Sequence, residues 1–547
     1  MVRRLGIDDF FSFIRALFAG EWRISVYIAR GEPVIDLIGE AILKMIGMIT
    51  IPLVVGIGLG IFLGKISSKN RGTWKDKAIQ FFSIFGISLS VIFFGLLLKY
   101  FLCEELGFCE PMGISAVPIG ILTISFSALI SWQTRSYMIK EPRNKSVVSN
   151  TIMIGIIFGF IFLFYMLIEY TFYIAGFSNL LLVSLILYDY FLLAGCLFAL
   201  LIMFVILILI SNLLFSFYMH KKSEYPEREL EPILARPKTI KRELLKKENH
   251  GKKILTWIFS NLKFLFLPGS RIEELSLREF EYEKKIGKRS IARRLKNPLT
   301  ILGYSVLFFV ITLAVFAEWL SPQVFDEAML PHAGSWNPPS SEYPLGQTVM
   351  GGDVLSKTIW GIRNALLFGF STILVGLVGG GILGYLAVIF NNWGERIING
   401  LMIFFYIIPG IILCLLYIGV YGPFTEFALP IIGILLIPNF TRAIASTIPR
   451  KINVKHITKT IISQIPLNLA IAIILYTSTE FLGFFMNVDI RLGDDIGLAF
   501  LNLSEAPWAS LWPGFALFGL IFGLFAVHAD LQGYELPLRE LVIVELK

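Results

Sequence analysis

Long apolar runs dominate this chain and decide what it can fold into. One of them, residues 191–217, contains no charged side chain. A helix needs about 20 mainly apolar residues to cross a bilayer, and a backbone in lipid must satisfy its own hydrogen bonds. Of the 547 residues, 56% are hydrophobic and only 16% are charged, against about 25% charged in soluble proteins. We therefore predict an all-α polytopic membrane protein.

About eleven segments are long and apolar enough to be read as transmembrane helices. Five precede a charged segment at residues 219–298 and six follow it. This divides the chain into an N-terminal segment (1–40), a first half (41–218), a linker (219–298) and a second half (299–547). The predicted spans lie near residues 42–64, 79–101, 115–133, 151–169, 191–217, 299–320, 364–390, 398–420, 425–441, 464–485 and 511–528.

The distribution of basic residues predicts the topology. Loops 65–77 and 135–145 are rich in lysine and arginine, whereas loops 102–116 and 171–190 contain neither. Because cytoplasmic loops carry the excess of positive charge, the first pair is expected inside and the second outside. Counting back five crossings places the N-terminal segment outside, and no cleavable signal peptide is recognised in it. The linker and the C-terminus are then cytoplasmic, at the plasma membrane of the cell.

The linker carries most of the excess positive charge, which is +8 for the whole chain. In a soluble protein such an excess suggests nucleic acid, but here it fits a cytoplasmic segment beside a membrane, and we expect no nucleic acid partner. Within the linker, residues 254–269 are apolar enough to lie on the inner leaflet. Membrane lipid is therefore an expected partner.

Two stretches of the first half recur in the second. "GLGIFLG" (58–64) precedes "WKDK" (74–77), and "GGGILG" (379–384) precedes "WGER" (393–396). Later, "EYTFYIAGF" (169–177) and "EFLGFF" (480–485) follow the penultimate helix of each half. Duplicated membrane halves usually pack about a pseudo-twofold axis with a pathway between them, and we predict that arrangement here.

The glycine-rich runs are better explained by helix packing than by phosphate binding. Gly64-Lys65 ends one such run, but a phosphate loop needs serine or threonine next, and Ile66 follows. Small residues let membrane helices approach closely. No nucleotide-hydrolysing motif is found, so any ATP must be bound by another chain.

Four acidic residues are the candidates for an external gate, or for contact with a solute or partner. Ionisable groups within or beside membrane spans are functional candidates by default, and three of the four lie near outer helix ends, where we expect water to reach them. The alternative is that each caps a helix or orders a loop. The candidates are Glu169, Asp189, Asp353 and Glu480.

No catalytic constellation, cofactor motif or metal-ligand spacing is present, and we expect neither an enzyme nor a cofactor. Cys103 and Cys109 flank a short polar loop that is predicted to be external, where a disulfide between them is possible. Two reduced thiols are the alternative. Cys196 and Cys414 lie within apolar runs and are expected to be buried thiols.

The stretch "EYPLGQTVMGGDVLSKTIWG" (342–361) joins two apolar runs of the second half. Its proline and glycines favour turns, and Asp353 stands where the N-cap of the next helix is expected. The stretch resembles a loop of the dipeptide, oligopeptide and nickel ABC importer permeases, which reads Leu-Gly-Thr-Asp, then Gly-Arg-Asp-Val-Leu-Ser, then a Tyr-Gly-Ala-Arg-like turn. The matching residues are Leu345, Gly346, Gly351, Asp353, Val354, Leu355, Ser356, Gly361 and Arg363.

The resemblance extends over both halves of the chain. Residues 504–524 look like the family's last external loop and last helix, so that residues 290–547 resemble one permease subunit. The first half resembles the partner subunit without its usual first helix. The resemblance implies two permease subunits fused in one chain, served by an external solute-binding protein and by separate ATPase subunits.

One departure concerns the cytoplasmic side. Such permeases carry a Glu-Ala-Ala…Gly loop between their fourth and fifth helices, whose short helix docks into the ATPase. Loops 132–150 and 441–468 lack that motif and are short. Two hypotheses therefore stand: a peptide-type importer permease, or a permease-derived scaffold that anchors a membrane complex and is no longer coupled to ATP hydrolysis.

Overall fold

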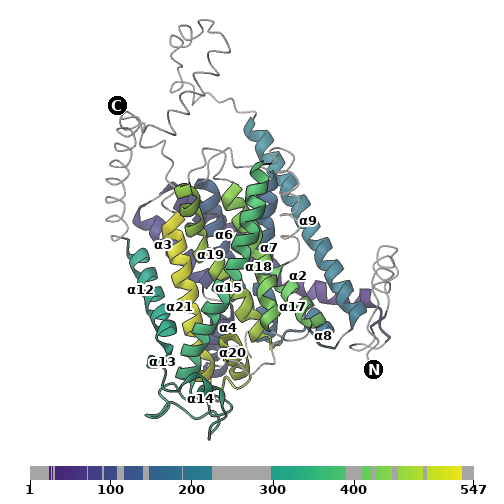
Figure 1. Cartoon of the computed structure of the whole chain (residues 1–547). Coiled ribbons are helices and arrows are strands. Elements are labelled where there is room, and N and C mark those ends of the chain that lie inside the picture. Colours follow the sequence, from purple (N-terminus) through teal and green to yellow (C-terminus); the bar gives the residue numbers. More distant parts are fainter. Residues whose placement is uncertain are drawn as a thin grey trace, which may run out of the picture. The chain divides into compact units, whose positions relative to one another are not determined.

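Figure 1 shows the fold of the chain in a computed structural model. It describes residues 24–25, 28, 31–70, 72–88, 91–106, 116–139, 147–187, 189–223, 297–389, 409–421, 425–445, 454–483 and 490–532. The chain divides into two compact units, residues 1–213 with 302–547, and residues 214–301. The described helices of both predicted halves therefore pack largely into one unit.

Helices account for the regular structure of the described residues, and β-pairing there is limited to two isolated bridges, Ile24–Pro33 and Gln347–Asp353. Before the linker the elements are α2 (Val34–Lys69), α3 (Trp74–Ser88), α4 (Val91–Leu98), the π-helix η1 (Lys99–Glu105), α6 (Ala116–Ile139), α7 (Val147–Thr171), α8 (Phe177–Ile186) and α9 (Tyr190–Ser223).

After the linker the short helices α13 and α14 follow α12, and the remaining elements are mostly long and apolar. They are α12 (Pro298–Val315), α13 (Ala317–Leu320), α14 (Phe325–Met329), α15 (Val354–Ile389), α17 (Gly410–Tyr421), α18 (Thr425–Ala445), α19 (Val454–Phe481), α20 (Leu492–Phe500) and α21 (Pro507–Gln532).

Every predicted span is helical over most of its described residues, and the protein is an α-helical, polytopic membrane protein. Seven described helices are long and apolar enough to cross a bilayer, and eight if α3 and α4, bent by 88°, form one broken span. Three shorter apolar helices add to these, within α7, α8 and α18. The predicted total of about eleven stays a prediction. The short helices α8 and α20 were not predicted; each follows the penultimate helix of its half.

Two helix pairs are each lined by three glycines spaced four residues apart. In α2, Gly56, Gly60 and Gly64 face α6, and a Cβ on Gly60 would stand 2.7 Å from the Ile130 Cβ. In α15, Gly376, Gly380 and Gly384 face α18, and a Cβ on Gly380 would stand 2.5 Å from the Phe440 Cβ. Glycines four residues apart lie on one helix face and let two backbones approach. Among the described residues, each predicted half thus contains a helix pair with this glycine spacing.

Aromatic side chains fill the contact between α21 and helices α3 and α4, which precede the linker. Phe518 packs edge-on against Phe85, with ring centroids 5.4 Å apart, and stacks on Phe93 at 5.9 Å. Phe81 meets Phe522 at 6.0 Å, one turn further along. A Cβ on Gly514 would stand 2.8 Å from the Phe93 ring, so the backbone of α21 lies close to α4 here. This contact joins elements of the two predicted halves.

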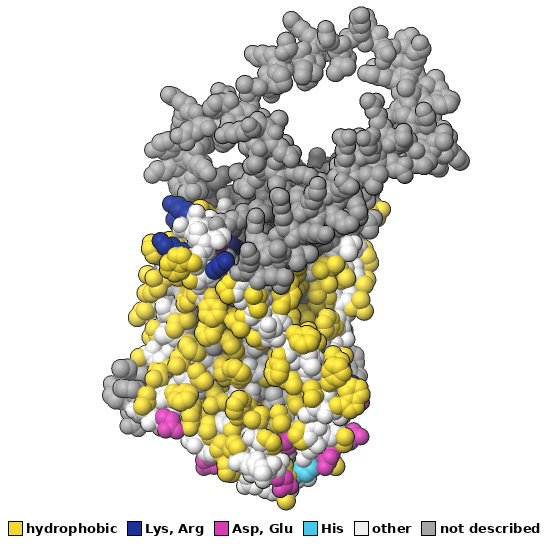
Figure 2. Space-filling model, turned by 90° about the vertical axis from the view of Figure 1, so that its left-hand side faces the viewer, with side chains coloured by type: hydrophobic (Ala, Val, Ile, Leu, Met, Phe, Trp, Pro, Cys, Tyr) yellow, Lys and Arg dark blue, Asp and Glu magenta, His cyan; other side chains and the backbone are white. Residues whose placement is uncertain are grey.

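The face of the described residues seen in Figure 2 is apolar over its middle and charged at its two ends. Lysine and arginine gather at one end. Aspartate and glutamate gather at the other, where α14 carries Asp326 and Glu327. An apolar belt between polar ends is what a bilayer-spanning protein presents to lipid.

Candidate functional site

The carboxylate of Glu169 joins the end of α7 to the start of α8. Its Oε2 accepts the backbone N–H groups of Ser178 at 2.8 Å and Asn179 at 3.0 Å, both in the first turn of α8. Tyr165, one turn earlier on α7, donates its hydroxyl to Oε1. The first N–H groups of a helix have no partner within the helix, and a carboxylate also suits the positive end of the helix dipole.

Glu480 has the same position at the end of α19. Its Oε2 accepts the backbone N–H of Gly493 at 3.0 Å, in the first turn of α20. Tyr476 precedes it by one turn and hydrogen-bonds with the carboxyl. The two tyrosine–glutamate pairs have the same i,i+4 spacing, and each binds the N-terminus of the short helix that follows.

Glycine is required where each carboxylate meets the backbone. A Cβ on Gly176, immediately before α8, would overlap Glu169 Oε1. A Cβ on Gly493 would stand 2.6 Å from the Cβ of Glu480 and 2.9 Å from its Oε2. Any larger residue would displace the carboxylate from the N–H groups that it accepts.

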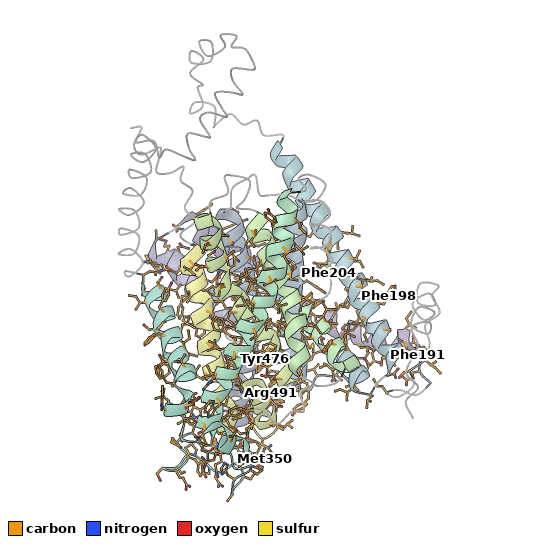
Figure 3. The ribbon with its side chains drawn as sticks, viewed as in Figure 1. Phe191, Phe198, Phe204, Met350, Tyr476 and Arg491 are labelled. Atoms are coloured by element: carbon orange, nitrogen blue, oxygen red, sulfur yellow. The ribbon has the colours of Figure 1, made fainter. Side chains whose placement is uncertain are left out.

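Charged residues surround the start of α20. Arg491, which is 2% exposed, acts electrostatically on Glu480 and Asp494, and Figure 3 labels it together with Tyr476. Lys357 of α15 donates to Asp495 at 3.1 Å. Burial, and then the charge of Asp495, raise the pKa of Asp494 to about 6. The start of α20 is therefore tied to both α15 and α19.

Asp353 caps α15, which confirms the predicted N-cap. Its Oδ2 accepts the backbone N–H of Ser356 at 2.8 Å and the Ser356 hydroxyl at 2.5 Å. The chain before it is held by Gln347, whose Nε2 donates to the carbonyls of Gly351 and Ala333 at 2.9 and 3.2 Å. The stretch that includes residues 342–361 is thus an ordered loop that leads into a helix.

The ordered loop exposes an apolar tip. Val349 and Met350 are 40% and 63% exposed, whereas Gln347, two residues earlier, is 1% exposed. Gly346 and Gly351 have φ of +81° and +73°, values that glycine adopts freely. Gly346 also leaves no room for a side chain, because its Cβ would stand 2.5 Å from the Trp508 ring.

Asp189 lies at the start of α9. Its Oδ2 accepts the hydroxyl of Ser25 at 2.6 Å, and its Oδ1 faces the backbone N–H of Leu192 at 3.4 Å. A residue of the N-terminal segment is thereby fixed to the first turn of a helix more than 160 residues later.

The expectation that water reaches the acidic candidates at the outer helix ends is wrong. Glu169, Asp189 and Asp353 are each 1% exposed and Glu480 is 0% exposed, because each carboxylate lies against a helix N-terminus. Their contact with a solute stays a prediction. The structure places Glu480 beside the start of α20 and Asp353 at the start of α15. Glu169 lies beside the start of α8, and Asp189 follows the end of α8.

The sequence did not indicate Arg491, Lys357 and Asp494 as site residues, because their roles depend on contacts that form only in the folded protein. The tyrosine four residues before both Glu169 and Glu480 was a usable signal, because it repeats in the two halves. Cys103 and Cys109, for which a disulfide or two reduced thiols were both possible, have side chains outside the described residues. Cys196 and Cys414 are buried free thiols, as expected. Within the described residues no group of His, Cys, Asp and Glu could hold a metal ion.

These features define a class: a multi-pass α-helical membrane protein in which buried carboxylates join the ends of neighbouring helices. Comparison with known proteins is more specific, since the chain is similar to permeases of peptide ABC transport systems. It is 25% identical to the dipeptide transport system permease DppC of Alkalihalophilus pseudofirmus over 260 residues, 43% of this chain and 85% of that protein. It is 24% identical to the oligopeptide transport system permease OppC of Mycobacterium bovis over 272 residues, 44% of this chain and 90% of that protein.

A shorter similarity concerns a different cargo. The chain is 28% identical to the glutathione transport system permease GsiD of Pectobacterium atrosepticum over 156 residues, 28% of this chain and 50% of that protein. No family model matches the chain. The similarity to peptide transport permeases thus rests on individual relatives, each of which covers less than half of this chain.

Proposed function

We propose that this chain is the membrane permease of a peptide-type ABC import system and carries both permease halves in one polypeptide. The observation that carries the proposal is the recurrence of two structural devices, one copy in each half. The first is the glycine contact, α2 with α6 and α15 with α18. The second is the tyrosine–glutamate pair that binds the next helix, at Glu169 and at Glu480. Such recurrence is expected of duplicated halves that pack around a pathway.

The lengths of the similarities support the same reading. The dipeptide and oligopeptide permeases align over 260 and 272 residues and are nearly covered. One predicted half, residues 299–547, has a comparable length. In this proposal the other half is the degenerate copy of the partner subunit, which is why single-subunit relatives cover less than half of the chain.

An external solute-binding protein is the partner that the acidic end of the molecule suits. Residues 316–353 include no lysine or arginine, and Glu318, Asp326, Glu327 and Glu342 lie on their surface. The exposed tip at Met350 adds an apolar contact to this acidic surface. The absence of basic residues also supports an external position for this region, with the linker and the C-terminus on the cytoplasmic side.

A specific observation favours the alternative of a scaffold that no longer couples to ATP. α6 ends at Ile139 and α7 begins at Val147, and α18 ends at Ala445 and α19 begins at Val454. The connections 140–146 and 446–453 are therefore where a helix that docks into an ATPase would have to lie. Such short connections leave room for about two helical turns at most, with no residues to spare for the flanking loops.

The test is to purify the protein from its native membrane in mild detergent and to identify stoichiometric partners by mass spectrometry. Two ATPase subunits together with a solute-binding protein would support the importer. A stable complex that holds an external or membrane partner and hydrolyses no ATP would contradict it and leave the scaffold. Peptide-stimulated ATP hydrolysis by the purified complex in vesicles then tests the cargo.

A further inference from the structure

The ammonium group of Lys99 lies in an aromatic setting at the outer end of the molecule. Lys99 begins η1, and its Nζ is 4.3 Å from the ring centroid of Phe500 and 4.7 Å from that of Tyr173. The same Nζ donates to the backbone carbonyl of Thr171 at 3.2 Å. The two rings stack, with centroids 5.6 Å apart. A cation within about 6 Å of aromatic faces is attracted by their negative charge density.

These residues come from both sides of the linker. Lys99 and Tyr173 belong to the first half, whereas Phe500 ends α20 in the second. Tyr170 extends the contact, since its ring meets Phe481 of α19 at 5.5 Å and Phe500 at 6.4 Å. The contact therefore joins the start of η1 and the turn after α7 to the end of α20.

The contact is solvent-accessible on one side and dry on the other. Tyr173 is 65% exposed, whereas Phe481 and Phe500 are each 1% exposed. Tyr173 also has φ of +52°, in the left-handed region that residues with a side chain seldom adopt. A strained residue persists where its surroundings hold it, and such positions are often found at switches and clamps.

We propose that Lys99, Tyr173 and Phe500 form a latch that reversibly closes the outer ends of the two halves. A cation–π contact beside water is weak enough to break in an ordinary conformational change, unlike the more extensive aromatic contact between α21 and helices α3 and α4. Opening would separate Phe500 from Lys99 and Tyr173 and expose the outer end of α19. The role of the latch as an outer gate rests on the proposed permease function. The reversible contact itself does not depend on that function.

Ser478 offers a reporter on the buried side of the latch. It is 1% exposed, lies one turn before Phe481 on α19, and its hydroxyl has no hydrogen-bond partner among the described residues, so that Ser478→Cys removes no such contact. Cys103 and Cys109 are replaced by serine, and Cys196 and Cys414 stay in place because they are buried. The rate at which a water-soluble maleimide modifies the purified protein then measures how often the latch opens.

Lys99→Met keeps the length of the side chain and removes its charge, so that we expect modification of the thiol introduced by Ser478→Cys to become about tenfold faster. Lys99→Arg retains a cation and should restore the slow rate. Lys44→Met, which removes an exposed lysine paired with Glu40, is the matched control and should leave the rate unchanged. Thermal unfolding of each variant checks that Lys99→Met still folds.

Equal rates for Lys99→Met and the parent would overturn the latch, as would a fast rate for Lys99→Arg, because packing alone would then explain the contact. Phe500→Leu, which keeps an apolar side chain without a ring face, gives a second test and should also accelerate modification. None of these readouts requires ATP or a solute. If the latch opens and closes as expected but the protein has no ATPase partners, the proposed importer function is rejected and the proposed latch still holds.

Discussion

The buried carboxylates of Glu169 and Glu480 have the same local structural role. Each replaces water as the acceptor for N–H groups that a helix start leaves without partners. A buried donor that loses its acceptor costs more free energy than the hydrogen bond itself contributes. At the residue scale, the stability of the starts of α8 and α20 therefore depends on these two side chains.

We expect Glu169→Ala and Glu480→Ala each to lower the free energy of unfolding by ~1–3 kcal/mol, because buried N–H groups of α8 or α20 lose their acceptor. Thermal unfolding in detergent, followed by size-exclusion chromatography, measures the change. Glu40→Ala is the control, since Glu40 forms only an exposed ion pair with Lys44 and should have little effect. Unfolding of the Glu169 variant at the control's temperature would contradict the capping role.

The raised pKa of Asp494 predicts that the stability of the protein depends on pH. Burial and the neighbouring charge of Asp495 raise its pKa from an ordinary 3.8 to about 6. A raised pKa means that the folded state favours the proton, so the contribution of Asp494 to stability is present below about pH 4 and is lost as the pH rises through about 6. Asp494→Asn should therefore gain stability relative to the parent at about pH 7.5 and not at about pH 4.

The comparison of melting temperatures at the two pH values separates this effect from other titrating groups, because those are shared by the parent and the variant. Asp326→Asn, at an exposed position of α14, is the control. A stability difference between Asp494→Asn and the parent that is the same at both pH values would show that the raised pKa is not what matters.

At the scale of elements, the two glycine-lined helix pairs depend on the absence of a few methyl groups. A Cβ at Gly60 or Gly380 would overlap the facing helix, whereas the ideal Cβ positions at Gly58 and Gly381 meet nothing within 4 Å. Gly58 and Gly60 both lie on α2, two residues apart, and Gly380 and Gly381 are neighbours on α15. Helix propensity is therefore the same in the two cases, and only the facing helix differs.

We expect Gly60→Ala and Gly380→Ala to destabilise the protein by ~1–3 kcal/mol through overpacking. Gly58→Ala and Gly381→Ala should leave stability unchanged or raise it slightly, since alanine is the better helix former. Thermal unfolding of the four variants in one detergent is the measurement. If Gly58→Ala and Gly60→Ala had the same effect on stability, α2 would not approach α6 closely at Gly60. The same holds for Gly380→Ala and Gly381→Ala, and for the approach of α15 to α18.

At the scale of the whole molecule, the aromatic contact between α21 and helices α3 and α4 joins segments that the linker separates in sequence. Phe518 lies at its centre, against Phe85 and Phe93. Aromatic pairs are favourable beyond the area that they bury, and in lipid such packing replaces the hydrophobic effect as the force between helices. We therefore expect the two predicted halves to associate even without the covalent linker.

Residues 1–218 and 299–547, co-expressed as two chains, should purify together through a tag on either one. Phe518→Ala should reduce the recovered partner several-fold, because it removes the central ring of the contact. Phe370→Ala, at a 51% exposed position of α15, should not. Failure of the unmodified chains to purify together would show that the linker, rather than the aromatic contact, holds the halves.

Much of the fold follows from the sequence for a simple reason. An apolar run in lipid must satisfy its backbone internally and so becomes a helix, and Asp353 caps α15 because its acceptor reaches the next turn. The helices α8 and α20 were missed because they are short and their stability comes from carboxylates on the preceding helices. Their apolar residues alone do not distinguish them from loop.

The sequence by itself determined the helical membrane class, the repeated glycine and glutamate motifs and the resemblance to peptide permeases, because these depend on local composition and spacing. Only the tertiary structure decided which groups meet. It buried the four carboxylates, brought Lys357 to Asp495 across 138 positions, and placed Lys99 against Phe500. The physical reason is that such contacts are made by packing between helices, and the energy of packing depends on neighbours that are distant in the chain.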